Sequence, residues 1–424
     1  MTDLLQRERQ PPLDDQPTSG SLTGDRQPSG SRVASSVSRF LSSCASFIGY
    51  TILLIVLGAA IVELASWAIW HIHPITRPAD LENQRRSPVY TGVAWAQEFW
   101  QEESARRIRT AVYVPFRLWS VTNWHGKYIN NDQGVKGVWR RTINPANCDA
   151  PHRVTVWTFG ASTIYGTAVP DWETIPSYLS RELNAGADNC VVVSNFGVEG
   201  YVTDQEVILL DEQLKAGGHP DIVIFYDGVN DSSLAWPPSS SPTAHFLFGT
   251  IKTRVEGSLS GRLDFLQKSY AVRLLREVSA RLHPAASFAS LVSKDQPNVL
   301  AMVDNYEANM RLVRALGEAY KFKVYCFWQP ILVYGHKPFV PFEQQMATNG
   351  ASGTTADSAW LLTMAAGYRE AERRARGGGK FIFLGGLFDS TKEPVYLDEA
   401  HLGPRGNEIA AEAIASYIKD HPEH

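Results

Sequence analysis

The sequence predicts an α/β domain over residues 151–421, a three-layer α/β/α sandwich built on a parallel sheet. From Val154 onward, runs of β-forming residues alternate with segments of helical spacing. This alternation is typical of parallel strands joined by helices that cover both faces of a sheet. Helix-ending signals support the pattern, because Gly217-Gly218 follows directly on the helix expected over Asp204–Ala216.

The elements of this domain follow from the hydrophobic periodicity. Five strands are expected, at Val154–Phe159, Val191–Asn195, Asp221–Tyr226, Val324–Trp328 and Phe381–Leu384. Helices are expected at Trp172–Asn184, Asp204–Ala216, Tyr270–Leu282, Val299–Tyr320, Trp360–Arg376 and Pro404–Asp420. Two long inserts, Trp236–Phe265 and Pro330–Gly353, follow the third and fourth strands. Since long loops on a rigid scaffold often carry specificity, we expect both inserts to form the rim of a site.

The first 72 residues predict a disordered tail followed by a transmembrane helix. Residues 1–46 are rich in Ser, Pro, Gln, Asp and Arg and have no periodicity, so they bury too little apolar surface to order. Residues 47–72 are almost wholly apolar, with one charge at Glu63, and about 20 such residues cross the hydrocarbon of a bilayer. The run starts too late and is too long for a cleaved signal peptide.

Charge excludes one class of partner and leaves the orientation of the span open. The formal net charge is -4, and no block of Lys and Arg suggests binding to nucleic acid. Arg32 and Arg39 precede the predicted span, and Arg77, Arg85 and Arg86 follow it. The positive-inside rule therefore does not decide which end is cytoplasmic.

Residues 73–150 are expected to form a linker and a small Trp-rich accessory segment. Five of the 12 Trp residues fall between Trp95 and Trp139. Trp119, Trp124 and Trp139 could stack against sugars, or they could pack this segment onto the main domain. We favour packing, because aromatic side chains dominate ordinary cores and interfaces.

Polar residues follow the predicted strands, where ligands bind in open parallel sheets. In strand order they are Ser162; Asn195 and Gly197; Asn230; Gln329; and Asp398 with His401. Because the carboxyl ends of parallel strands share one edge, residues more than two hundred positions apart are expected to meet there. We expect Asn195 and Gln329 to contact substrate.

Three of these residues have the chemistry of nucleophilic acyl transfer. Ser162 follows a strand that ends at a glycine and turns into a helix, so its hydroxyl is expected at the sheet edge. His401 is placed to take the serine proton, and Asp398 can bind the other ring nitrogen and fix its tautomer. The non-catalytic alternatives are that His401 is a surface residue and that Asp398 caps a loop.

An oxyanion forming at Ser162 would need donors already in place. We expect them to be the backbone N–H groups of Ser162 and Gly197 and the side-chain amide of Asn230. Each lost donor typically raises the barrier by about 3 kcal/mol. Asn230 could instead be a turn residue, and Gly197 could serve only to allow a tight turn.

Four short blocks carry a resemblance to the SGNH (GDSL-like) hydrolase family. They are Gly160-x-Ser162, Asn195-x-Gly197, Gly228-x-Asn230-Asp231 and Asp398-x-x-His401. The resemblance covers most of Val154–Ile418 and implies a flavodoxin-like sheet. It also implies Ser162 as nucleophile, His401 as base and Asp398 as the acid that orients it, with Gly197 and Asn230 in the oxyanion hole. Ala161 stands where the family usually has the Asp of Gly-Asp-Ser, a departure that bears on substrate class more than on activity.

The resemblance also gives a prediction for the cysteines. Cys148 and Cys190 each precede one of the first two strands, which are neighbours in the implied fold. We therefore expect a disulfide bond between them, which requires an oxidising compartment. Cys44 adjoins the span and Cys326 lies in a strand, where a buried thiol is expected.

The whole chain resembles bacterial membrane-attached members of the family, many of which are linked to surface polysaccharides. We expect an inner-membrane protein with an extracytoplasmic serine esterase domain that removes acyl groups, acetyl above all, from a glycan or related ester. The alternatives are an O-acyltransferase acting on a surface polysaccharide and a non-catalytic glycan-binding or assembly module. The serine mechanism needs no metal or organic cofactor, and His71-x-His73 has no further ligands nearby in sequence to form a metal site.

Overall fold

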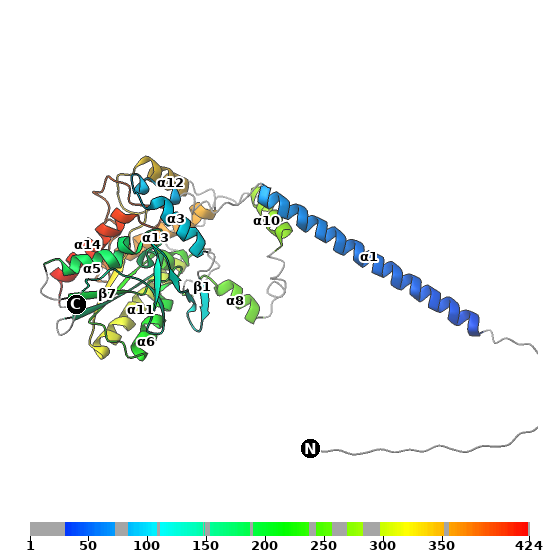
Figure 1. The fold of residues 1–424 in the computed structure, drawn as a ribbon, viewed down its shortest axis with the longest axis horizontal. Coiled ribbons are helices and arrows are strands. Elements are labelled where there is room, and N and C mark those ends of the chain that lie inside the picture. The colour runs from blue at the N-terminus through cyan, green and yellow to red at the C-terminus, as the bar shows by residue number, and fades with distance from the viewer. Residues whose placement is uncertain are drawn as a thin grey trace, which may run out of the picture. The chain divides into compact units, whose positions relative to one another are not determined.

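The computed structural model divides into two compact units, Met1–Ala68 and Ile69–His424 (Figure 1). It describes residues 30–72, 84–107, 111–146, 148, 153–186, 190–236, 243–256, 269–282, 297–351 and 356–422. The fold below is that of the second unit, apart from helix α1, which is described by itself.

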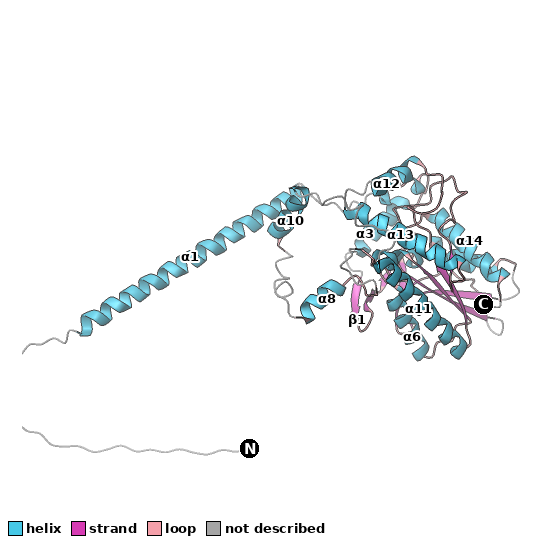
Figure 2. Cartoon of the chain, turned by 180° about the vertical axis from the view of Figure 1, so that it is seen from behind, coloured by secondary structure: helices cyan, strands magenta, loops and turns pink. Residues whose placement is uncertain are grey.

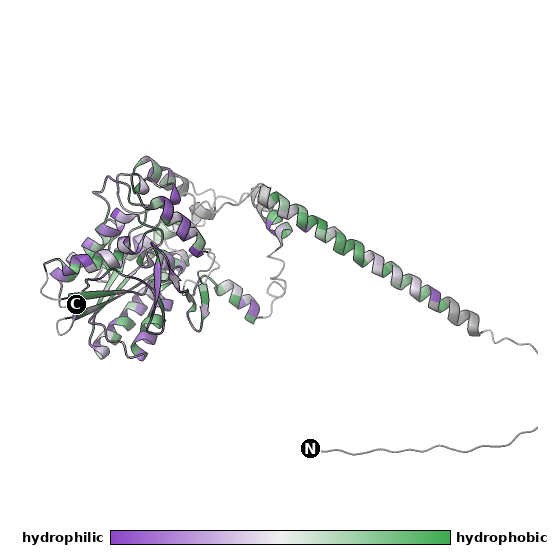
Figure 3. Ribbon diagram, in the orientation of Figure 1, coloured by the Kyte–Doolittle hydropathy of each residue, from purple (hydrophilic) through white to green (hydrophobic). Residues whose placement is uncertain are grey.

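Helix α1 (Gly30–Ile72) contains the predicted span. Its segment Arg39–Ile69 is the one helix in the described residues that is long and apolar enough to cross a membrane, as its mostly green colouring indicates (Figure 3). The helix begins earlier than predicted, so the expectation of a disordered tail is wrong for residues 30–46, since an apolar helix, once formed, extends into adjoining residues of fair helix propensity. Residues 1–29 of that tail lie outside the described residues.

The centre of the second unit is an eight-stranded sheet in the order β10-β9-β8-β6-β7-β5-β4-β3. Its five parallel strands are β6 (Arg153–Gly160), β7 (Cys190–Asn195), β8 (Ile222–Asp227), β9 (Lys323–Trp328) and β10 (Ile382–Phe383). All five lie where the sequence predicts strands. Numbered along the chain, their spatial order is 2-1-3-4-5, the flavodoxin-like order.

Two layers of helices cover the sheet, as predicted (Figure 2). On one face, α5 (Ile175–Asn184) and α14 (Pro404–Asp420) pack on the sheet residue Val156 and its neighbours. On the other face lie α6, α11 and α13, packed around Trp157. Because side chains alternate along a strand, these consecutive residues point into opposite layers. The bounds of the second set are Thr203–Lys215, Pro297–Tyr320 and Ala356–Arg376.

The remaining helices of eight or more residues in the described part of this unit are α3, α8, α10 and α12. Their bounds are Ala96–Arg107, Phe248–Val255, Tyr270–Leu282 and Pro341–Ala351. Of these, α8 lies in the first predicted insert and α12 in the second.

The predicted accessory segment is not separate from the domain. Strands β3 (Trp124–His125), β4 (Asn130–Gly134) and β5 (Gly137–Arg140) extend the same sheet, and β5 pairs antiparallel with β7 through Arg140 and Asn195. The expected boundary after residue 150 therefore falls within one sheet, because the outer side of β7 is paired by an earlier part of the chain. A further hairpin, β1 (Ala111–Val114) with β2 (Leu118–Val121), is formed by the same segment.

The tryptophans of this segment pack against the protein core, which is the alternative favoured from the sequence. Trp139 is buried in the main core, Trp119 packs against that core, and Trp124 packs against a smaller cluster around Phe99. The indole N–H of Trp119 donates to the backbone oxygen of Glu199 at 2.9 Å.

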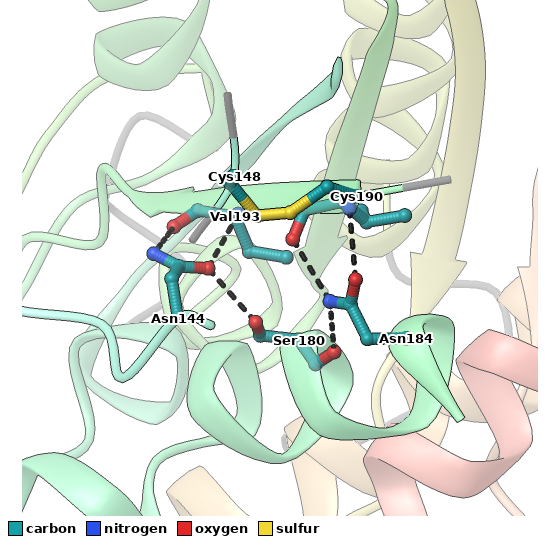
Figure 4. The surroundings of a disulfide bond; sticks show 7 residues. Asn144, Cys148, Ser180, Asn184, Cys190 and Val193 are labelled. Atoms are coloured by element: carbon teal, nitrogen blue, oxygen red, sulfur yellow. Dashed lines mark hydrogen bonds between the residues drawn. A yellow bond between two sulfur atoms is a disulfide. The ribbon is translucent and has the colours of Figure 1, made fainter. Parts of the chain in front are cut away.

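Cys148 and Cys190 form the expected disulfide bond (Figure 4). Asn144 lies beside it, and its amide oxygen accepts from the Val193 N–H and the Ser180 hydroxyl, both at 2.8 Å. The bond and this network join the end of the accessory segment to β7 at the amino edge of the sheet, away from the strand ends that carry the polar motifs.

Candidate active site

Ser162 is presented by the turn from β6 into the short helix α4 (Ser162–Tyr165). Gly160 closes the strand, and a Cβ there would lie 2.5 Å from Ile164 and 2.7 Å from the backbone oxygen of Tyr226. The tight turn therefore requires glycine at this position. Gly166 ends α4 with a φ of 85°, in the left-handed region.

A hydrogen-bonded chain joins Ser162, His401 and Asp398. Nε2 of His401 lies 2.8 Å from Oγ of Ser162, and Nδ1 lies 2.7 Å from Oδ2 of Asp398. The other oxygen of Asp398 accepts from the backbone N–H groups of Ala400 at 2.8 Å and His401 at 2.7 Å. The three residues that sequence analysis proposed as catalytic are thus in hydrogen-bond contact, although 239 positions separate the serine from the histidine.

The electrostatics of this chain favour the roles that the geometry allows. Burial raises the pKa of the Asp398 carboxyl, but the charge and hydrogen bonds of His401 outweigh it and hold that pKa well below its usual range. Burial lowers the pKa of His401, and the charge and hydrogen bond of Asp398 raise it by more, so the net shift is upward. The imidazole is therefore a stronger base than usual, and it accepts the serine proton only above its raised pKa.

A fourth residue, Gln84, completes the surroundings of the aspartate. Its side-chain N–H donates to Oδ2 of Asp398, the oxygen that also binds His401. Gln84 is buried, and neighbouring Ser87 donates its hydroxyl to the backbone oxygen of Tyr396 at 3.3 Å. The sequence does not predict this role of Gln84, because nothing in the linker marks a residue whose partner lies 314 positions away.

The loop that carries Asp398 and His401 is also held from the second insert. Glu343 of α12 is fully buried and accepts from the N–H groups of Val395 at 2.9 Å and Tyr396 at 3.1 Å. Lys337 neutralises it at 2.7 Å. The expectation that this insert forms the rim of the site is wrong for its described residues, because they support the histidine loop from behind instead.

Two of the residues expected to donate to an oxyanion, Ser162 and Asn230, line the cavity around the serine hydroxyl. The Ser162 N–H lies at the start of α4, and Asn230 lies in α7 (Val229–Ser233) at the wall of the cavity around the serine. One hydrogen of the Asn230 amide goes to the backbone oxygen of Tyr201 at 2.7 Å. Among the described residues, its second hydrogen donates to no other group.

Gly197 does not fit its predicted role. Its N–H donates to Oδ1 of Asn195 at 2.9 Å, and a Cβ on Gly197 would lie 2.3 Å from the backbone nitrogen of Tyr165. The glycine therefore allows close packing against α4. The cavity wall is instead formed by Gly200, at a φ of 79°, whose N–H donates no hydrogen bond among the described residues.

Asn195 also differs from its prediction as a substrate contact. It is buried, and its amide N–H donates to the backbone oxygen of Ile164 at 2.8 Å. Both ends of the side chain thus bind backbone groups, so Asn195 shapes the turn and does not line the cavity. Gln329 does line the cavity, and its amide oxygen accepts from the Thr163 hydroxyl at 3.1 Å.

The cavity above Ser162 has a volume of about 600 Å³. Phe246 from the first insert and Trp360 from α13 form part of its wall, so the first insert reaches the site as expected. Glu199 also faces it, with its carboxylate bound by Thr167 at 2.8 Å and by the buried Arg106 at 3.2 Å. One side of the cavity is therefore apolar, and the other is polar, with the charge of Glu199 balanced by Arg106.

A group of buried carboxyls lies beneath Asn230. Burial raises the pKa values of the Glu206 and Asp227 carboxyls well above the usual range, and repulsion from neighbouring carboxylates adds to both shifts. Burial raises the pKa of Asp231 to about 6, although the Thr203 hydroxyl donates to it at 2.6 Å. These carboxyls therefore bind protons more tightly in the folded protein than they would in the unfolded chain.

No protein-family model matches the sequence, and no curated protein matches it. Solved structures that it resembles include a lipase/acylhydrolase from Enterococcus faecalis, with 16% identity over 63% of this chain and 96% of that chain and a TM-score of 0.31. An acetylxylan esterase from Geobacillus stearothermophilus has 13% identity over 62% and 94%, with a TM-score of 0.32. A member of the lipolytic G-D-S-L family from Veillonella parvula has 10% identity over 62% and 97%, with a TM-score of 0.29.

These identities and TM-scores are too low to carry a function across, so the function depends on the geometry of this chain. The flavodoxin-like strand order and the meeting of Ser162, Asn230 and His401 at one edge of the sheet are what the resemblance to the SGNH hydrolases implied.

Proposed function

We propose that this protein is a serine esterase that uses Ser162, His401 and Asp398. The observation that supports it is the pair of short contacts made by one imidazole, 2.8 Å to the serine oxygen and 2.7 Å to the carboxylate. A surface histidine or a capping aspartate would not need this alignment. Direct contact between nucleophile, base and orienting acid is the geometry that acyl transfer requires.

The reaction follows from these contacts. Oγ of Ser162 attacks the ester carbonyl carbon as its proton passes to Nε2 of His401, and Asp398 stabilises the imidazolium that forms. The developing oxyanion accepts from the N–H groups of Ser162 and Gly200 and the amide of Asn230. The bond between the carbonyl carbon and the alcohol oxygen then breaks, the alcohol leaves with the proton from His401, and the acyl group stays on Ser162. Water, activated by the same imidazole, releases the acid and restores the serine.

The setting of the enzyme is part of the proposal. We infer that α1 anchors the protein in a membrane, on the strength of its length and apolar composition. The disulfide bond between Cys148 and Cys190 favours an oxidising compartment, such as the bacterial periplasm, for the catalytic unit. A membrane-anchored esterase so placed would meet acylated surface glycans, the substrate class that the sequence resemblance implied.

A fluorophosphonate probe tests the assignment. The full-length protein in detergent micelles is expected to form a covalent adduct at Ser162 and to hydrolyse p-nitrophenyl esters. Ser162→Ala should abolish both, whereas Ser416→Ala, a change at an exposed serine of α14, should leave both unchanged. No adduct on the wild-type protein would favour the non-catalytic binding module. Acyl release that requires an added sugar acceptor would favour the O-acyltransferase.

A further inference from the structure

A second cavity, of about 430 Å³, adjoins the one above Ser162. Its walls come from the β1–β2 hairpin, the first insert and the loop after β7. The apolar side chains among them are those of Ala111, Trp119, Val121, Val198, Phe246 and Leu247.

The two cavities share Glu199, Gly200 and Phe246 in their walls. Gly200 is the residue whose N–H we assign to the oxyanion. A group attached to a carbonyl carbon held at that N–H can therefore extend directly from the catalytic cavity into the second one.

The second cavity is chemically unlike the first. Of its described lining residues, only Glu199 and Ser120 have polar side chains besides the Trp119 indole. The indole N–H is taken by the backbone oxygen of Glu199, so Trp119 presents ring carbon to the space. The Glu199 carboxylate is bound by Arg106 and Thr167 at the shared border. Such a space favours an aliphatic chain over a sugar, whose hydroxyls would lose water without partners.

The position of His401 determines whether the acyl half or the alcohol half of the ester enters the second cavity. The leaving alcohol must lie within hydrogen-bond reach of Nε2 of His401, which supplies its proton. His401 lines the first cavity and not the second. The alcohol part therefore lies on the histidine side of the catalytic cavity, and the acyl part points across Gly200.

We propose that the second cavity binds the acyl chain, and that the enzyme cleaves esters of straight-chain fatty acids in preference to acetate. The inference rests on the proposed esterase function and names its acyl group. The acetyl group expected at the outset would leave this cavity empty, and the apolar contacts along Trp119 and Leu247 would go unused.

The test measures kcat/KM for p-nitrophenyl acetate, butyrate, hexanoate and octanoate, with the full-length protein in detergent micelles. The value should rise by about fourfold for each added methylene that the cavity buries. Ala111→Phe, which fills the cavity from the hairpin, should flatten this rise, so that kcat/KM for octanoate loses most of its advantage over kcat/KM for acetate. Val112→Phe is the matched control, because the adjacent strand residue points to the opposite face and does not line the cavity.

A pair of isomers separates the two halves of the ester. Ethyl octanoate and octyl acetate have the same formula and closely similar partition into micelles, but carry the long chain on opposite sides of the ester bond. Ethyl octanoate should be cleaved faster, and Ala111→Phe should remove the difference. Leu247→Trp, which narrows the cavity from the first insert, should have the same effect as Ala111→Phe. Agreement between the two variants would show that the effect does not come from misfolding of one of them.

The outcomes are distinct. An active enzyme with a flat or falling chain-length profile, a preference for octyl acetate, or a rise that Ala111→Phe leaves intact would overturn the acyl-chain cavity while the esterase function stands. A protein without turnover of any ester and without a fluorophosphonate adduct would overturn the esterase function and the cavity assignment together.

Discussion

Replacement of Gln84 by alanine tests whether this residue positions Asp398, the aspartate proposed to orient His401. Gln84 supplies one of four hydrogen bonds to Asp398, and the others come from His401 Nδ1 and the backbone N–H groups of Ala400 and His401. In the Gln84→Ala variant the carboxylate keeps three partners, including both that fix Oδ1. Its orientation should therefore loosen without being lost.

Two effects should be measurable. A looser Asp398 holds His401 less firmly, and we expect the plateau value of kcat to fall about tenfold, or ~1.4 kcal/mol of barrier. At the same time Oδ2 no longer shares its charge with a second donor, so its attraction for the imidazolium increases and the pKa of His401 rises further above its ordinary value. Because His401 must be neutral to act, the acid limb of kcat/KM should move to higher pH, by up to about one unit.

The assay is a pH profile of p-nitrophenyl ester hydrolysis for the wild-type protein, Gln84→Ala and a matched control. Gln101→Ala removes the same side chain from an exposed position on α3 of the same N-terminal segment and should reproduce the wild-type profile. Loss of a buried hydrogen bond to a charged group also costs about 1.5–3 kcal/mol of unfolding free energy, which urea unfolding measures separately. If Gln84→Ala loses stability but its pH profile coincides with that of the wild type, Gln84 is a structural residue and the positioning argument is refuted.

Three further perturbations have defined outcomes. Asn230→Ala should lower kcat about 10²–10³-fold with little change in KM; a KM effect alone would place Asn230 in substrate binding. Reduction of Cys148–Cys190, which closes a 42-residue separation, should lower the unfolding free energy by about 4 kcal/mol and leave the kcat of the folded protein unchanged. Because the buried carboxyls hold protons that the unfolded chain releases, unfolding free energy should fall as pH rises from about 4 through about 6, the pKa of Asp231. Glu206→Gln should flatten this fall; an equally steep profile would contradict the raised pKa of Glu206.

The parts of the fold that the sequence predicted are those with strong local signals. The strand around Val156 and the helix Pro404–Asp420 show clear periodicity or a proline at the helix start, and the fifth strand was found despite its two paired residues. The convergence of Ser162 and His401 followed from topology alone, because the carboxyl ends of parallel strands share an edge.

The errors arose where distant contacts decide. The sequence has two glycines after β7, and only the packing of Gly197 against Tyr165 determines that Gly200 is the one at the cavity wall. The pairing of Arg140 with Asn195 makes the accessory segment part of the sheet. The hydrophobic periodicity of the sequence does not indicate this pairing. In the sequence Glu343 looks like an ordinary helix residue, and only the folded structure shows that it binds the loop before Asp398.

The two outermost strands of the eight-stranded sheet, β10 (Ile382–Phe383) and β3 (Trp124–His125), are only two residues long. Strands this short offer little template for strand addition between molecules. Crowding of many copies into a small area should not drive them into continuous β-structure.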